Sequence, residues 1–143
     1  MTKKEREPKL FTVEEANRLL PEVRRFLQEL RARQDEVEAL EKKKAVEQLS
    51  WLESDGSVNP RAQEELSRLE GQQRVAGEAF KKALEGLTGL GAQLKDPQEG
   101  LVDFFAARGG ERVYLCWKHG EDRIRFWHDL QSGFAGRRPL GEL

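Results

Sequence analysis

The stretch DPQEGLVDFFAARGGERVYLCWKHGEDRIRFWH, residues 96–128, decides the fold class of this chain. Within it, β-branched and aromatic residues gather in three short runs that are separated by glycine-containing segments. Short apolar runs between such turns are typical of the strands of a β-meander. We therefore predict three antiparallel strands, at 101–105, 112–117 and 123–128, joined by tight turns at Arg108-Gly109 and His119-Gly120.

The two turns determine which residues lie opposite each other in the predicted meander. The first turn pairs Phe104 with Val113, and the second pairs Leu115 with Ile124. Because side chains alternate between the two faces of a strand, both pairings give the same apolar face, which we expect to pack on helices. The residues of this predicted face are Val102, Phe104, Val113, Leu115, Trp117, Ile124, Phe126 and, at its end, His128.

The opposite face of the predicted meander carries polar groups. Asp103, Tyr114 and Arg125 fall in one cross-strand row on this face, where direct neighbours are about 5 Å apart. A carboxylate, a phenol and a guanidinium in one row can form a connected binding group, with Arg123 and Trp127 beside it. The alternative is a solvated face without a binding role, since antiparallel sheets ordinarily leave one face in water.

Before residue 96, apolar residues recur at spacings of three, four and seven, as on the narrow seam of a coiled coil. Thr12 and Glu15 form a capping box, so the first helix should begin at Val13. Pro21 should end or kink that helix, because proline lacks the amide hydrogen and its ring clashes with the preceding turn. We predict a short helix from Val13 to Leu20, then a long helix with Pro21 in its first turn.

A second long helix is predicted after the turn-rich segment 54–60, with Asn59 as its N-cap and Pro60 as its first residue. Its apolar stripe continues to Leu94. The sequence thus predicts an α+β fold, in which a long antiparallel helical hairpin with a short N-terminal helix accompanies a three-stranded antiparallel β-meander. We expect a flexible arm at 1–10, the hairpin at 11–95, and the meander and C-terminal loop at 96–143, packed with the helices as one domain.

Composition narrows the classes of function. The chain has 25 basic and 26 acidic residues, so its net charge of -1 supplies no general attraction for nucleic acid, which we do not expect as a partner. It lacks an apolar run of about 18 residues and begins with a polar segment, which predicts neither a membrane span nor a secretory signal. A single cysteine excludes an intrachain disulfide. We expect a cytoplasmic protein.

A metal site is the first enzyme-like hypothesis, because several ligand-type side chains lie close together in sequence. These are Asp103, Cys116, His119, Glu121, His128 and Asp129. The predicted pairing places Cys116 and His128 on opposite faces, so the whole set is not expected to converge. The version of the metal-site hypothesis that we retain is a divalent metal ion held by Asp103, His128 and Asp129, together with helix carboxylates such as Glu14 or Glu15. Cys116 is interpreted as a packing residue.

Anion binding is a second hypothesis. Gly133 and Gly136 bracket a loop that is followed by Arg137 and Arg138, and backbone amides with guanidinium groups suit an anion. The alternative is that both arginines cap carbonyl groups or pair with helix carboxylates. The candidate ligand-binding residues are Asp103, Tyr114, Arg123, Arg125, Trp127, Arg137 and Arg138.

Six segments of the chain resemble one known family. They are FTVEEANRLLPEVR at 11–24, GLVDF at 100–104, VYLCW at 113–117, GE at 120–121, FWHD at 126–129 and GFAGRRPL at 133–140. Together they make the chain similar, over nearly its whole length, to the prokaryotic family called domain of unknown function 2203. The C-terminal segments are the specific part of this resemblance. It implies no activity, cofactor or partner.

The helical hairpin suggests the leading functional hypothesis. A two-helix arm buries little apolar surface by itself, so apolar residues near its tip, including Trp51 and Leu52, are candidates for an interface. We expect a non-enzymatic interaction or assembly module that self-associates as a homodimer, with a protein partner for the arm as a further option. The alternative hypothesis is a small protein that binds an anionic ligand or a metal ion. One version of this hypothesis is that the protein catalyses hydrolysis. No catalytic residue is assigned.

Overall fold

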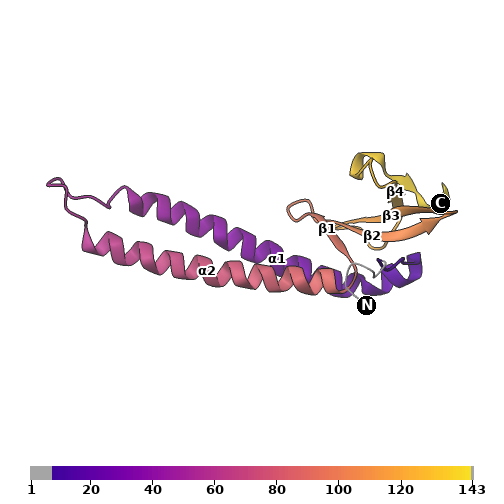
Figure 1. Cartoon of the computed structure of the whole chain (residues 1–143), viewed down its shortest axis with the longest axis horizontal. Coiled ribbons are helices and arrows are strands. Elements are labelled where there is room, and N and C mark those ends of the chain that lie inside the picture. Colours follow the sequence, from indigo (N-terminus) through magenta and orange to yellow (C-terminus); the bar gives the residue numbers. More distant parts are fainter. Residues whose placement is uncertain (1–7, 143) are drawn as a thin grey trace. The chain divides into compact units, whose positions relative to one another are not determined.

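The computed structural model describes residues 8–142 and divides them into two units, one made of 8–28 with 84–142 and the other of 29–83. Most of the expected flexible arm, residues 1–7, lies outside the described residues. Two long helices are drawn in Figure 1: α1, Val13–Gln48, and α2, Pro60–Gly89. Each contributes residues to both units. Neither helix has a stretch long and apolar enough to cross a membrane. The packing of hairpin and sheet as one domain stays a prediction.

The α+β class is confirmed, but the described residues form a five-stranded sheet where three strands were predicted. All neighbours are antiparallel and follow chain order. The strands are β1, Gln93–Asp96; β2, Leu101–Arg108; β3, Glu111–Lys118; β4, Phe126–His128; and β5, Arg138–Pro139. The two missed strands are short edge strands, which are too short to show an alternating pattern. Phe134–Gly136 and Leu140–Glu142 are short 3-10 helices.

The start of α1 agrees with the capping box. The Thr12 amide donates to Oε1 of Glu15 over 2.9 Å, and the Glu15 amide donates to Oγ1 of Thr12 over 3.1 Å. The predicted separate helix from Val13 to Leu20 is wrong, because α1 continues through Pro21. Leu20 and Val23 are fully buried on either side of this residue. Burial is worth about 1.5–3 kcal/mol for each such side chain, enough together to offset about 3 kcal/mol for an internal proline.

The start of α2 also agrees with prediction. Oδ1 of Asn59 accepts hydrogen bonds from the amides of Arg61 and Ala62, and Pro60 is the first helical residue. The helix ends at Gly89, earlier than the predicted Leu94. In the 29–83 unit, buried leucine and alanine side chains hold the two helices together. They are Leu30, Leu40, Ala62, Leu66, Leu69, Ala76 and Ala83.

In the other unit, the start of α1 and the residue Phe11 just before it support one face of the sheet. The Phe11 amide donates to the carbonyl of Phe105, and the ring of Phe11 meets that of Phe104 edge-on at 5.2 Å. Within α1 itself, Oδ1 of Asn17 accepts from the amide of Ile124 over 2.7 Å. The apolar face of the sheet is therefore covered by the helix.

The predicted register is wrong at both turns, with different consequences. The first turn lies at Gly109-Gly110, so Phe104 pairs with Leu115 instead of Val113. A shift of two residues leaves every side chain of β2 and β3 on its predicted face. The prediction of the apolar face is thus correct for these two strands.

The error at the second turn changes which side chains of β4 lie on each face of the sheet. Leu115 pairs with Trp127 and Cys116 with Phe126, which differs from the predicted register by three residues. An odd shift turns every side chain of β4 to the other face. The connection is a loop over 119–125, in which Ile124 is bound to α1, instead of a tight turn at His119-Gly120. Trp127 therefore lies on the apolar face, and His128 shares a face with Cys116.

Candidate functional site

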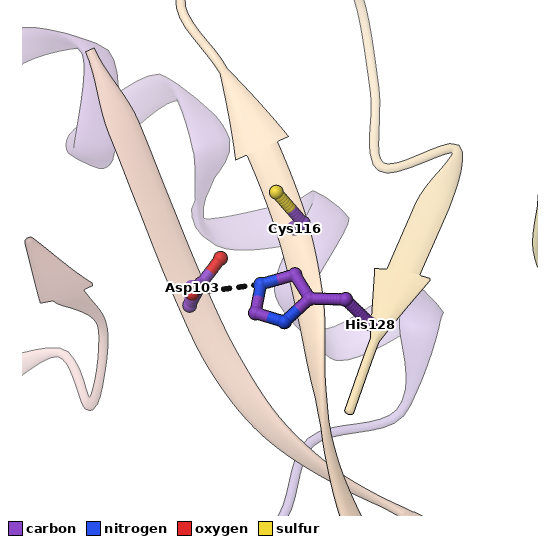
Figure 2. Close-up of side chains that lie close together, drawn as sticks. All are labelled: Asp103, Cys116 and His128. Carbon is purple, nitrogen blue, oxygen red and sulfur yellow. Dashed lines mark hydrogen bonds and ion pairs between the residues drawn. The ribbon is translucent and has the colours of Figure 1, made fainter. Parts of the chain in front are cut away.

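Three adjacent strands each contribute one buried side chain to a single cluster. Asp103 on β2, Cys116 on β3 and His128 on β4 lie close together (Figure 2), and each is at most 3% exposed. Asp103 and Cys116 are direct cross-strand partners, while His128 lies opposite Tyr114 and reaches across β3. One carboxylate oxygen, the thiol sulfur and one ring nitrogen lie within 4.8 Å of one another.

Both ring nitrogens of His128 have an oxygen partner. Nε2 lies 3.0 Å from Oδ2 of Asp103, and Nδ1 lies 2.6 Å from the carbonyl oxygen of Asp129. A carbonyl and a carboxylate only accept, so this arrangement favours a ring that donates from both nitrogens. Burial lowers the pKa of His128, but its bonds to Asp103, Cys116 and the Asp129 carbonyl outweigh burial and raise this pKa from 6.5 to about 10.

The second oxygen of Asp103 lacks a hydrogen-bond partner. Within residues 8–142, no donor lies in range of this buried Oδ1 atom. An unsatisfied buried acceptor costs about 1–3 kcal/mol, and more when it is charged. A group that supplies positive charge at this point would remove that cost.

A cavity of about 150 Å³ adjoins the cluster. Besides the three clustered side chains, it is lined by Lys95 from β1, by Tyr114, and by Gly133 and Phe134 from the C-terminal loop. Nζ of Lys95 donates to the Tyr114 hydroxyl over 3.1 Å, and that hydroxyl donates to Oε1 of Gln93 over 3.0 Å. The buried cluster therefore opens into a small chamber that has the ammonium group of Lys95 at its wall.

The residue types of the cluster suit a transition metal ion. Zinc accepts Cys, His and Asp ligands at about 2.0–2.3 Å, which places tetrahedral ligand atoms about 3.5 Å apart. Nε2 of His128 and Oδ2 of Asp103 are already 3.0 Å apart. The wider separations among the three ligand atoms, which reach up to 4.8 Å, would have to shrink by about 1 Å through rotation of the side chains. The bond from Nδ1 of His128 to a carbonyl oxygen directs Nε2 to the other two ligands, as in metal-ligating histidines generally.

The comparison with family models agrees with the resemblance. Residues 9–140 match the model described as "Uncharacterized conserved protein (DUF2203)". The chain belongs to the DUF2203 family. No curated protein and no solved structure matches it.

For the predicted metal set, the DUF2203 fold brings Asp103 and His128 together but not the side chain of Asp129. Oδ1 of Asp129 accepts from the amides of Gln131 and Ser132, so this carboxylate shapes the C-terminal loop. The side chain of Glu15 is used in the helix cap, and Glu14 is exposed. Cys116, which the predicted register separated from His128, completes the cluster instead.

The predicted row of Asp103, Tyr114 and Arg125 does not form. Arg125 is directed to the exposed carboxylate of Asp122 at 3.0 Å, in the loop before β4. Its predicted position in a strand depended on a tight turn at His119-Gly120, where the structure has a loop instead. Asp103 and Tyr114 do line the same cavity.

The other candidate ligand-binding residues of the DUF2203 chain lie outside the cavity. Arg137 bonds to Oε1 of Glu121 over 2.6 Å and to the carbonyl of Cys116, so it joins the C-terminal loop to β3. Arg138 lies over the buried ring of Trp127 at 5.3 Å. Arg123 is exposed.

Sequence reasoning missed Cys116 and Lys95. For Cys116, the available signal was a carboxylate, Asp103, within an otherwise apolar strand, since a buried carboxylate needs a partner on its own face. For Lys95 there was no signal, because the segment around it was assigned to a helix. Its place depends on the pairing of β1 with β2.

The candidate interface residues lie in the 29–83 unit, near the connection between the helices. Leu52 is 61% exposed and Trp51 is half-buried, while neighbouring Leu49 is 86% exposed. These three side chains line one groove together with Gln48 and Leu66. The apolar tip of the arm is thus open to contact.

Proposed function

We propose that this protein binds a divalent transition metal ion through Asp103, Cys116 and His128. The observation that carries the proposal is the buried carboxylate of Asp103: its Oδ1 atom lacks a donor, and one of its oxygens lies within 4.8 Å of both a thiol sulfur and an imidazole nitrogen. A cation at this point would satisfy the carboxylate without any change in the backbone. The cytoplasm is the proposed location, because a reducing compartment keeps Cys116 free to act as a ligand.

The chemistry of the ligands supports zinc or a neighbouring first-row ion. Thiolate and imidazole select such ions over magnesium and calcium, which prefer oxygen ligands. Three protein ligands leave a fourth position, as in zinc sites that bind a further molecule. Here the adjoining cavity is the place for that molecule.

Cobalt substitution tests this proposal directly. Purified protein is treated with a chelator, transferred to metal-free buffer and titrated with Co²⁺, while the thiolate-to-cobalt absorption band is recorded. We expect one ion per chain and loss of the band in Cys116→Ser, with strongly weakened binding in His128→Gln. The matched control is His119→Gln, because His119 is the other histidine of the sequence and its side chain is exposed. Absence of the band in the parent, or equal effects of both histidine variants, would overturn the proposal.

A second candidate function is self-association through the helical arm. It is favoured by Val46, Leu49 and Leu52, which are 65%, 86% and 61% exposed near the tip. A shallow groove beside Val46 carries both Lys43 and Glu65. A surface with both signs of charge can pair with itself in a two-fold dimer, as a four-helix, coiled-coil arrangement would require.

Sedimentation of designed variants tests the second candidate. We expect a dimer for the parent and a monomer for Leu49→Glu and Leu52→Glu, because each substitution places a charge in the apolar contact. Leu10→Glu is the control, since Leu10 is 46% exposed in the other unit. A parent that sediments as a monomer would refute this candidate.

A further inference from the structure

We infer that the cavity beside the metal site binds a small carboxylate, with one oxygen directed to the metal ion and the other to Lys95. This inference rests on the proposed function and adds the class of ligand. It starts from the fact that the cluster and Lys95 face one chamber of about 150 Å³. That volume equals about five water molecules at about 30 Å³ each, so it admits an acid of only a few carbon atoms.

The charge of the chamber favours an anion. A divalent ion would be balanced by the carboxylate of Asp103 and the thiolate of Cys116, which leaves the ammonium group of Lys95 as the excess charge. Within the described part of the chain, Lys95 makes no ion pair, and its polar partner is the hydroxyl of Tyr114. An ammonium group has three donors, so others remain for a ligand.

The position of Lys95 is held by its neighbours. Its ammonium group lies 4.2 Å from the centre of the Tyr114 ring, and the Tyr114 hydroxyl is itself bound to Gln93. Cation–π attraction and a hydrogen bond to the same ring keep the charge at the cavity wall. The Tyr114 proton is already used toward Gln93, so this hydroxyl offers an acceptor, not a donor, to the chamber.

The apolar part of the cavity wall favours a carboxylate over phosphate as the ligand. Leu101, Leu130 and Phe134 give the chamber an apolar side, against which a short hydrocarbon chain can pack. Phosphate presents more oxygens than Lys95 and a metal ion can satisfy, whereas a carboxylate presents two. The chamber therefore fits a short-chain acid such as propionate better than inorganic phosphate.

The experiment uses the cobalt-loaded full chain with propionate and inorganic phosphate as probes. Binding to the ion changes the visible cobalt spectrum, and calorimetry gives the affinity. We expect propionate to alter the spectrum and to bind more tightly than phosphate. We expect Lys95→Met to weaken propionate binding at least tenfold with cobalt affinity unchanged, and Lys81→Met, an exposed lysine on α2, to have no effect.

The outcomes separate the two proposals. Normal cobalt binding without a response to propionate overturns the carboxylate inference alone. The same holds if phosphate binds more tightly, or if Lys95→Met binds propionate as the parent does. Failure of cobalt to bind overturns both the metal site and the inference that rests on it.

Discussion

At the scale of single residues, the cluster depends on a buried contact between His128 and Asp103. Their side chains are 3% and 4% exposed, so water screens their attraction weakly. Without a metal ion, the proton on Nε2 of His128 supplies the positive charge that the carboxylate needs. A metal ion would replace that proton, so acid should compete with the metal.

The metal-free protein should lose stability as the pH rises from about 6.5 to about 10. The folded pKa of His128, about 10, exceeds the ordinary value of 6.5, so the folded state binds the extra proton in this range. The stabilisation is complete below pH 6.5 and disappears as the pH passes 10. Urea unfolding at several pH values, with a chelator present, measures the effect.

The parent and His128→Gln should differ in this experiment. The difference between their unfolding free energies should shrink as the pH rises, since other groups that titrate near pH 10 are common to both. His119→Gln should follow the parent. A constant difference across the range would show that the ring of His128 is not protonated in the folded state.

At the scale of elements, glycines in α2 have unequal roles. A Cβ atom at Gly86 would collide with the ring of Phe26 on α1, whereas a Cβ atom at Gly77 would meet nothing within 4 Å. Gly86 thus permits the close approach of the two helices. Gly77 only adds flexibility to the unfolded chain.

Alanine substitutions should therefore act in opposite directions. Gly86→Ala should lower the free energy of unfolding by about 1–3 kcal/mol through overpacking. Gly77→Ala should raise it by about 0.5–1 kcal/mol through helix propensity. Chemical denaturation followed by circular dichroism measures both. Equal effects would mean that the helices are not in close contact at Phe26.

Pro21 provides a second prediction for an element. Because α1 continues through it, Pro21→Ala should restore a backbone hydrogen bond and remove the clash of the ring, stabilising the protein by about 1–3 kcal/mol. The exposed neighbour Glu22 serves as a control, and Glu22→Ala should change stability by less than about 0.5 kcal/mol. A loss of stability in Pro21→Ala would indicate that the proline is needed to shape the helix.

At the scale of the whole molecule, the metal site draws its ligands from three strands and so exists only in the folded chain. Metal binding should raise the thermal midpoint, because an ion at about one hundred times its dissociation constant adds about 2.7 kcal/mol to stability. A thermal-shift assay with Zn²⁺ should show this rise in the parent and not in Cys116→Ala. A rise of equal size in the variant would place the ion elsewhere.

Local features were predictable because their causes lie within a few residues. The capping box joins Thr12 to Glu15, and Asn59 caps the two amides that follow Pro60. The face on which each side chain of β2 and β3 lies was also predictable, since the predicted register was wrong by an even number of residues. The continuity of α1 through Pro21 was not, because burial of Leu20 and Val23 against other segments overrides the local preference.

The sequence by itself determined the α+β class, the beginnings of both helices and the family to which the chain belongs. Only the tertiary structure decided that His128 meets Asp103 and Cys116. The amide of Ile124 is bound by Asn17, which is 107 positions away, and the loop that results sets the register of β4. Because strand side chains alternate with a period of two, that odd shift alone transfers His128 from the apolar face to the site.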